Sequence, residues 1–410
     1  MLWTRKPAAP PDRARVVGVD LSASRVRAVS VGGGKVRPLA LDGPAEELAL
    51  FVACDRRDPE VGRAGLALAR KGPHAVVSNF LAALGQPREF RAGRAVLTAD
   101  AALALAFART RDAVAAESDA GGLVVPAYLA TAQVAKAVAA AGRAKVAFKG
   151  TASAPLAVAA HRAAAVLTGK PPAAPGTPGD NVIPLRPLPA GPGSVVVVDA
   201  DEFALSAAVV TVERDAVRLG AVGYWPRAGV KVWTDRLLDA LADRCVRLCR
   251  RDPRDSADAE QLLFDQLDAA LDAARGGHRV SLTVRTAHWF QDLIQQPDEF
   301  DGNCPALAES SARSVWELVA GAGLPFPPRV VWLTHTAGRL PGLARAVHAN
   351  TPEGTTVEVL PPGAVAHAAA ALVPRWLAEG LPRSHLDTVI PLPANSSPPT
   401  AGLPKSSTQR

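Results

Sequence analysis

Residues 15–31, RVVGVDLSASRVRAVSV, and residues 194–212, SVVVVDADEFALSAAVVTV, share one pattern. In each stretch an apolar run ends in an aspartate, Asp20 or Asp199, and a short turn leads into a second apolar run. A third run follows after another turn in both places. Short apolar runs bounded by turn residues are typical of β-strands. We therefore predict an internal duplication, in which each copy begins with three strands.

Alanine-rich segments with few helix-breaking residues follow the strands in both halves, and they predict helices. The expected helices are residues 99–117, 129–144, 232–250, 256–275, 340–350 and about 363–373, with one more strand at 329–333. Strands mixed with helices in two similar halves indicate an α/β protein. We expect two α/β lobes with a cleft between them.

Local composition divides the chain into five parts. Residues 169–194 hold too many Pro and Gly for a helix or a central strand, so we interpret them as a linker or insertion between the lobes. The expected parts are a disordered N-terminus at 1–12, lobe I at 13–168, the linker at 169–194, lobe II at 195–374 and a largely disordered tail at 375–410.

The overall composition is that of a globular protein, with 48% hydrophobic and 21% charged residues among 410. Four cysteines show no paired framework, which indicates a reducing compartment. The start lacks a signal-peptide pattern and no apolar run approaches ~18 residues, so we expect a cytoplasmic protein without a membrane segment. The net charge of +7 comes from scattered residues, and nucleic-acid binding usually needs clustered ones. Nucleic acid is therefore not an expected partner.

Six segments in order resemble the nucleotide-binding domain of the heat shock protein 70 (DnaK-type) chaperones. They are VVGVDLSASRV, VGRAGLALARKGPHAVVSNFLAALG (61–85), VVPAYLATAQVAKAVAAAGR (124–143), VVVVDADEFALSAAVV, VVWLTHTAGRLPGL (330–343) and GAVAHAAAAL (363–372). The third is the most specific, because VPAY, Gln133 and AGR are all in register. The resemblance covers about residues 13–374. It implies an actin-like ATPase fold, a duplicated ribonuclease H-like architecture, without the family's substrate-binding β-sandwich.

The resemblance also implies a site for ATP or ADP with Mg2+ between the lobes. Such sites hold phosphates with backbone N–H groups in tight turns of small residues, and aspartates order the metal. Asp20 and Asp199 are the implied metal-binding residues. Arg25 could reach a phosphate, and Arg339 could stack on a purine. The implied nucleotide-binding residues are Asp20, Ser22, Ala23, Ser24, Arg25, Asp199, Gly338 and Arg339.

The second phosphate turn departs from the family, because Asp201, Glu202 and Phe203 stand where three glycines are expected. Phe203 adds bulk where a backbone should touch phosphate, and the carboxylates repel it. One like-charge pair at 4 Å costs about 4 kcal/mol at an effective dielectric of 20. We interpret the segment as a solvated acidic turn, in preference to a rearranged metal site.

The positions that the family uses for catalysis and adenosine binding have also changed. Leu81, Ala152 and Ala204 replace a lysine, a glutamate and a threonine, and none of these side chains can move a proton or position a water. No catalytic residue is therefore assigned. On the adenine side, paired glycines become His335 and Thr336. At the ribose positions, the family's Glu and Lys become Asp268 and Leu271.

These observations predict a divergent heat shock protein 70-like pseudo-ATPase with weak or no ATP binding. It would act as a chaperone-related binding or scaffolding module for a protein partner or client. The alternative is an active ATP-dependent chaperone-type ATPase with a rewired site, in which Asp20 and Asp199 hold the metal, with Asp201 or Glu202 as a further candidate ligand. A sugar or acetate kinase on the same fold is a third interpretation, but it also needs intact phosphate turns.

Overall fold

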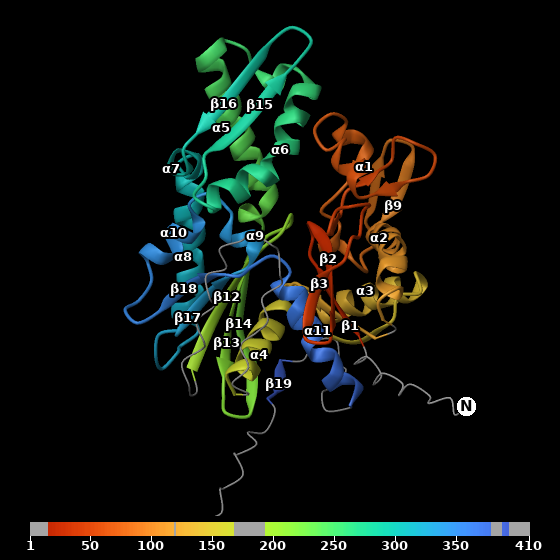
Figure 1. The fold of residues 1–410 in the computed structure, drawn as a ribbon, viewed down its shortest axis with the longest axis vertical. Helices are drawn as coiled ribbons and strands as arrows, with labels where there is room; N and C mark the ends of the chain where they lie inside the picture. The colour runs from red at the N-terminus through yellow and green to blue at the C-terminus, as the bar shows by residue number, and fades with distance from the viewer. Residues whose placement is uncertain (1–14, 119, 168–192, 379–387, 393–410) are drawn as a thin grey trace, which may run out of the picture.

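Two mixed β-sheets form the centre of the protein in the computed structural model, which describes residues 15–118, 120–167, 193–378 and 388–392 (Figure 1). The first sheet has the order β11 (Phe148–Ser153), β10 (Gly121–Val125), β1 (Val16–Leu21), β2 (Arg25–Gly32) and β3 (Lys35–Pro38), with β4 (Glu47–Ala49) also paired to β2. The second has the order β18 (Thr356–Val359), β17 (Val330–Leu333), β12 (Gly193–Ala200), β13 (Leu205–Val212), β14 (Ala216–Trp225) and β19 (Val389–Pro391).

The two sheets repeat one topology. In the first, β1, β2 and β3 are antiparallel neighbours, and β10 and β11 continue the sheet in parallel on the other side of β1. In the second, β12, β13 and β14 are antiparallel, and β17 and β18 continue in parallel beyond β12. The predicted α/β class is confirmed, and the two stretches 15–31 and 194–212 each supply the first two strands of a sheet.

Helices follow the strands in both halves. They are α1 (Arg63–Leu66), α2 (Ala99–Ala115), α3 (Thr131–Arg143), α4 (Ala154–Leu167), α5 (Val230–Cys249), α6 (Ala257–Arg275), α7 (Pro297–Asp301), α8 (Pro305–Gly321), α9 (His335–Gly338), α10 (Leu343–Ala349) and α11 (Ala364–Leu377). Side chains cap two of the predicted helices, since Thr98 accepts from the Ala101 amide and Ser256 from the Ala259 amide. The predicted helices are confirmed with small shifts of their ends.

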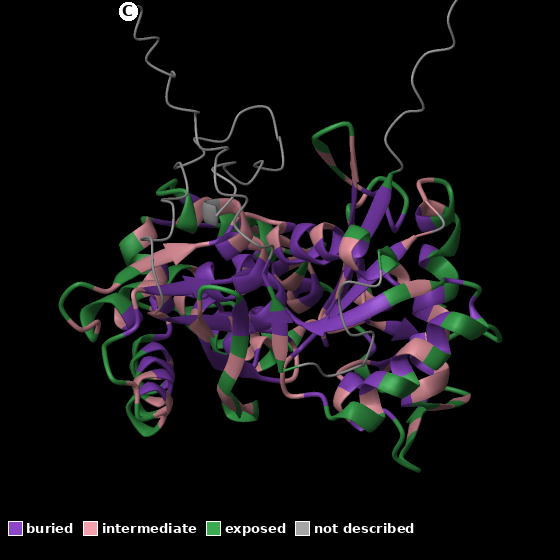
Figure 2. Ribbon diagram, turned by 90° about the horizontal axis from the view of Figure 1, so that it is seen from below, coloured by how far each residue is buried: buried purple, intermediate pink, exposed green. Residues whose placement is uncertain are grey.

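Short elements complete the two halves. The 3₁₀ turns are η1 (Pro73–Ala75), η2 (Leu81–Ala83), η3 (Pro226–Ala228) and η4 (Pro253–Asp255). The small sheets contain β5 (Val52–Ala53), β6 (Glu60–Val61) and β7 (Val76–Val77), then β8 (Glu89–Ala92) and β9 (Ala95–Thr98), and finally β15 (Val280–Arg285) and β16 (Phe290–Gln295). The buried residues of Figure 2 concentrate on the central strands and on the helix faces that cover them.

Helices α4 and α11 each pack on the central sheet of the other half of the chain. Helix α11, which follows the second sheet in the sequence, packs on β1, β2 and β10 of the first sheet. Helix α4, which follows the first sheet, packs on β13 and β14 of the second and also against α11, as Figure 1 shows. One apolar cluster therefore combines residues of both halves, with Val124 and Trp376 beside Val197 and Trp332. The division into lobes at 168 and 195 marks the strand repeat but not the boundaries of the core.

The C-terminal tail predicted at 375–410 needs a correction. Residues 375–377 are the last turn of α11, where Trp376 is buried, and residues 389–391 form β19 on the edge of the second sheet. Ile390 and Leu392 pack into the shared core, and this burial orders the strand. The N-terminus at 1–12 and nearly all of the 169–194 linker lie outside the described residues. Gly193 and Ser194, counted with the linker, begin β12.

None of the helices in the described ranges combines the length and the apolar character that crossing a bilayer requires.

Substituting Gly18→Ala tests the close packing of α11 on β1. A Cβ at Gly18 would lie 1.9 Å from the Ala366 carbonyl oxygen and 2.4 Å from the Ala370 amide nitrogen, so helix and strand would have to separate. We expect a loss of about 2–3 kcal/mol in unfolding free energy, measured by thermal denaturation followed by circular dichroism. The matched control is Gly142→Ala in α3, where the added Cβ meets no atom within 4 Å and alanine favours the helix. Equal melting temperatures for the two variants would contradict the expectation.

Candidate functional site

The carboxyl ends of β1 and β12 face one small pocket between the two halves. Asp20 from β1 and Asp199 from β12 both line it, together with Ser22, Arg25, Arg27, Ala200, Thr334, His335, Thr336, Pro361, Gly363, Ala364 and Val365. Its interior volume is about 20 Å³, roughly the room that a single water molecule needs. The structure thus brings the two predicted metal-binding aspartates together, in a space that side chains have largely filled.

Burial makes the two pocket aspartates hard to ionise. It raises the pKa of Asp20 to about 6, against the opposing charges of Arg27 and Arg25. It raises the pKa of Asp199 to about 7, and the nearby charge of Asp20 adds to this effect. The Thr334 hydroxyl donates to Asp199 Oδ1 at 2.6 Å and partly offsets it. Burial is therefore the main reason that both carboxyl groups resist ionisation.

Two carboxylates alone supply too few ligands for a metal site. Across the described part of the chain, no group of three His, Cys, Asp or Glu side chains is placed to hold a metal ion. Mg2+ prefers six oxygen ligands and usually shares them with waters and substrate phosphates. Asp20 and Asp199 fit a Mg2+–nucleotide only if the nucleotide itself supplies oxygen ligands.

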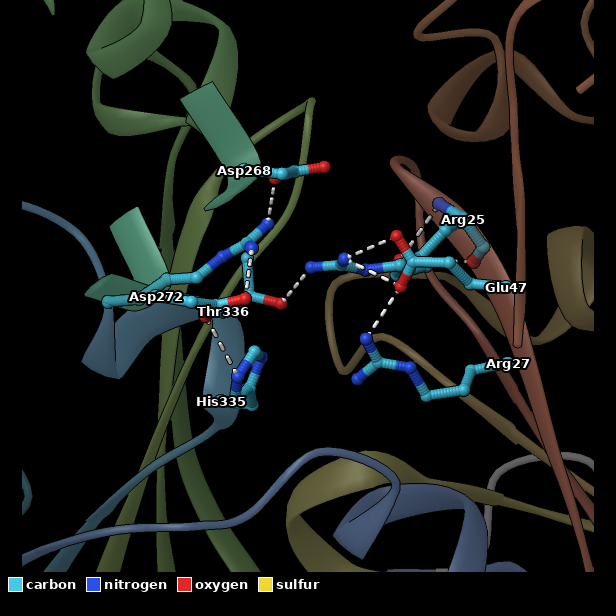
Figure 3. Close-up of polar contacts among 9 residues, drawn as sticks. Arg25, Arg27, Glu47, Asp268, Asp272, His335 and Thr336 are labelled. Carbon is cyan, nitrogen blue, oxygen red and sulfur yellow. Dashed lines mark hydrogen bonds and ion pairs between the residues drawn. The ribbon is translucent and has the colours of Figure 1, made fainter. Parts of the chain in front are cut away.

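Arg25 spans the pocket from the first half to the second (Figure 3). Its guanidinium donates to both oxygens of Glu47 at 3.0 and 2.8 Å, and to the Thr336 hydroxyl at 2.5 Å. Arg27 also bonds Glu47, at 2.6 Å. Burial opposes ionisation of Glu47, but Arg25 and Arg27 together lower the pKa of this carboxyl to about 2. The arginine expected to reach a phosphate is thus held by a carboxylate of its own half and a hydroxyl of the other.

The second turn is not the solvated acidic turn that the sequence suggested. Asp201 is only 2% exposed. Its Oδ1 accepts from the amides of Phe203 and Ala204, both at 3.0 Å. Its Oδ2 accepts from the Ala23 amide of the first turn at 2.9 Å and from the Tyr128 hydroxyl at 2.5 Å. The prediction of solvation was wrong because two of these donors, the Ala23 amide and the Tyr128 hydroxyl, come from segments that are distant in the sequence.

The position of Phe203 also differs from the expected one, in which its bulk would block a phosphate. Its backbone amide points at Asp201, while its ring packs 5.1 Å from the ring of Tyr128 and 6.2 Å from that of Tyr224. The neighbouring Glu202 is half-buried, and burial raises the pKa of this carboxyl to about 7. The turn keeps its amides directed inward, and the aromatic side chain leaves the pocket.

On the predicted adenine side, the polar groups bond to each other. Arg339 follows α9 and forms an ion pair with Asp268 of α6, the residue expected at the ribose. Arg339 also lies 3.7 Å from Asp272, which is 3.3 Å from His335 Nε2 (Figure 3). Burial lowers the pKa of His335 to about 4, so this imidazole is neutral at pH 7. These contacts occupy the groups that were expected to bind adenosine.

A third contact joins the halves near α1 and α6. Gln261 of α6 accepts from the amides of Arg70 and Lys71 at 2.7 and 3.1 Å, and it donates to the Leu66 carbonyl at 3.0 Å. Arg70 also donates to Asp235 of α5 at 2.6 Å. Gln261 is 6% exposed. The halves are therefore held together at this end by hydrogen bonds from a buried side chain.

The remaining predicted positions are structural. Ala23 contributes only its amide, Ser24 accepts from the Leu50 amide through its carbonyl, and Gly338 is buried where a Cβ would meet Val359 at 2.2 Å. The substituted catalytic positions Leu81, Ala152 and Ala204 are all buried. The sequence did not predict Glu47 and Tyr128 as contacts beside the turns, or Gln261 as a contact between the halves near α1. Only Tyr128 carried a signal, since it ends the VPAY motif.

Comparison of the sequence with protein-family models gave no match, and comparison with curated proteins gave none either.

Substituting Asp199→Asn tests the charge in the pocket. The folded state raises the pKa of Asp199 from 3.8 to about 7, so this group stabilises the fold fully only below pH 3.8 and loses that contribution as pH rises toward 7. Asparagine stays neutral and can still accept from Thr334. We expect the stability of Asp199→Asn relative to the wild type to increase by about 2–3 kcal/mol between pH 5 and pH 8. Thermal denaturation across this range measures it.

The control for this pH experiment is Asp58→Asn, which removes an exposed carboxylate. Its stability difference from the wild type should stay constant over the same range. If the stability difference between Asp199→Asn and the wild type is constant as well, the charge of Asp199 does not destabilise the folded state.

Proposed function

We propose that this protein is a divergent, heat shock protein 70-like domain of the actin-like ATPase fold that works without ATP turnover. In this proposal it is a binding or scaffolding module for a protein partner, with its two lobes held closed by its own side chains. The observation that carries the proposal is the guanidinium of Arg25, bonded to Glu47 and Thr336 across a pocket of about 20 Å³. A nucleotide needs far more space than this pocket leaves.

The energetics of the Arg25 contact support a stable closed arrangement. Arg25 is 8% exposed, and its Nη1 donates to both oxygens of Glu47 while its Nη2 donates to the Thr336 hydroxyl, so these bonds are charge-assisted. Opening the pocket would separate the guanidinium from Thr336, or remove it from Glu47 and leave a buried charge unpaired. A hydrogen bond to a charged group of this kind contributes about 1.5–3 kcal/mol. A phosphate would have to recover that cost before it bound.

The changed catalytic positions support the absence of turnover. Leu81 and Ala204 are fully buried apolar side chains at the positions where the family resemblance expects a lysine and a threonine. Hydrolysis requires a group that positions or deprotonates the attacking water. The titratable side chains that line the pocket are those of Asp20, Arg25, Arg27, Asp199 and His335. The Arg25 guanidinium is already hydrogen-bonded to Glu47.

The shared strand order of the two sheets supports the fold part of the proposal. Each sheet places three antiparallel strands beside two parallel ones, which is the order that a duplicated ribonuclease H-like architecture implies. The exchanged helices α4 and α11 pack between the sheets, so the carboxyl ends of β1 and β12 meet in the position of a ligand site in such folds.

One observation favours the alternative of a rewired ATPase. Asp20 and Asp199 both reach the pocket, and both keep the carboxylates that a Mg2+–nucleotide would need. In that case the Arg25–Thr336 bond would open on nucleotide entry. Substituting Asp199→Ala would then abolish turnover, since Asp199 is one of the two aspartates among the described residues that line the pocket.

Titration of the full-length protein with Mg-ATP by calorimetry, with a parallel phosphate-release assay, separates the two functions. We expect no binding in the micromolar range and no phosphate release above the rate without protein. An active heat shock protein 70-type ATPase measured in the same assay is the control. Micromolar binding with turnover that Asp199→Ala removes would establish the rewired ATPase instead.

A further inference from the structure

The carboxylate of Asp201 lies where the two turns converge. Its Oδ1 accepts from Phe203 and Ala204 of its own turn, which is the local geometry of an aspartate-stabilised turn. Its Oδ2 accepts from the Ala23 amide in the turn of the other half. The second contact cannot arise from local turn chemistry, because 178 positions separate the two residues. One carboxylate thus joins the backbones of both turns.

The donors around Asp201 form the kind of site that binds an oxyanion. Three are backbone amides from two turns and the fourth is the hydroxyl of Tyr128, at distances between 2.5 and 3.0 Å. Convergent backbone N–H groups in turns are a general way of holding phosphate-like anions. Every one of these donors is a neutral group, and the carboxylate they surround is 2% exposed. The site therefore has the chemistry of an anion cradle, filled by a side chain of the same chain.

We propose that Asp201 is a built-in anionic ligand, which occupies a phosphate-class oxyanion site formed by the two turns and closes the halves without a bound anion. This inference rests on the proposed function, because it concerns the same junction. It explains why acidic residues are found in a turn where a bound phosphate would repel them. The carboxylate takes over the hydrogen bonds that the anion would otherwise receive.

Chemical rescue of Asp201→Ala tests this assignment. Removing the carboxylate leaves the amides of Ala23, Phe203 and Ala204 without their acceptor and opens a small space. We expect the melting temperature to fall by at least about 5 °C. Added formate or inorganic phosphate at tens of millimolar should restore at least half of that loss. The wild type should respond to the same anions no more than it does to chloride of equal ionic strength.

The matched control is Glu202→Ala, which removes the adjacent carboxyl group of the same turn. This variant should show no specific rescue, because Glu202 has no place among the four donors. The inference is overturned if Asp201→Ala is as stable as the wild type. It is also overturned if formate and phosphate stabilise Asp201→Ala no more than they stabilise the wild type and Glu202→Ala.

Hydrogen exchange on the wild type provides a test that does not depend on folding of the variant. The Ala23 amide should be protected in an anion-poor buffer, and added phosphate should not change its rate. An unprotected Ala23 amide, or protection that appears only with phosphate, would contradict the inference. These outcomes are distinct from those of the ATP titration. Binding of Mg-ATP by the wild type contradicts the proposed function, whereas failed rescue without ATP binding contradicts only the role of Asp201.

Discussion

The exchange of α4 and α11 between the two sheets is the packing on which the rest of the structure depends. Each sheet needs one face covered by apolar side chains, and part of that cover comes from the other half of the chain. Gly18 allows the backbone of β1 to approach α11 so closely that no side chain fits between them. Neither sheet can therefore bury its apolar face alone, and the two halves are fixed relative to each other through one shared core.

This fixed arrangement brings the carboxyl ends of β1 and β12 together and so creates an electrostatic problem. The charge of Asp201 opposes ionisation of Asp20, and the charges of Asp20 and Asp201 oppose ionisation of Asp199. The protein reduces the problem in two ways. Asp201 is surrounded by four hydrogen-bond donors, and Arg25 and Arg27 place positive charge beside Asp20 while they pair with Glu47. The charges that meet at this junction are thus balanced by groups of the protein itself.

Particular residues show how far sequence reasoning reached. The strands around Asp20 and Asp199 were predictable because apolar runs with short turns have few other stable conformations. The helices at 99–117 and 256–275 were predictable because composition and N-capping residues act locally. Asp201 was interpreted wrongly because its charge was weighed without its partners. Ala23 and Tyr128 are 178 and 73 positions away from Asp201 in the sequence, and no local pattern predicts contacts between residues so far apart.

The sequence by itself determined the strand repeat and the α/β class, since both follow from residue type and local order. The tertiary structure decided where the charged groups go. It placed Arg25 between Glu47 and Thr336, paired Arg339 with Asp268, and buried Asp201 under the amides of both turns. The physical reason is that the energy of a charge depends on burial and on neighbours brought together by folding, neither of which is a property of the residue alone.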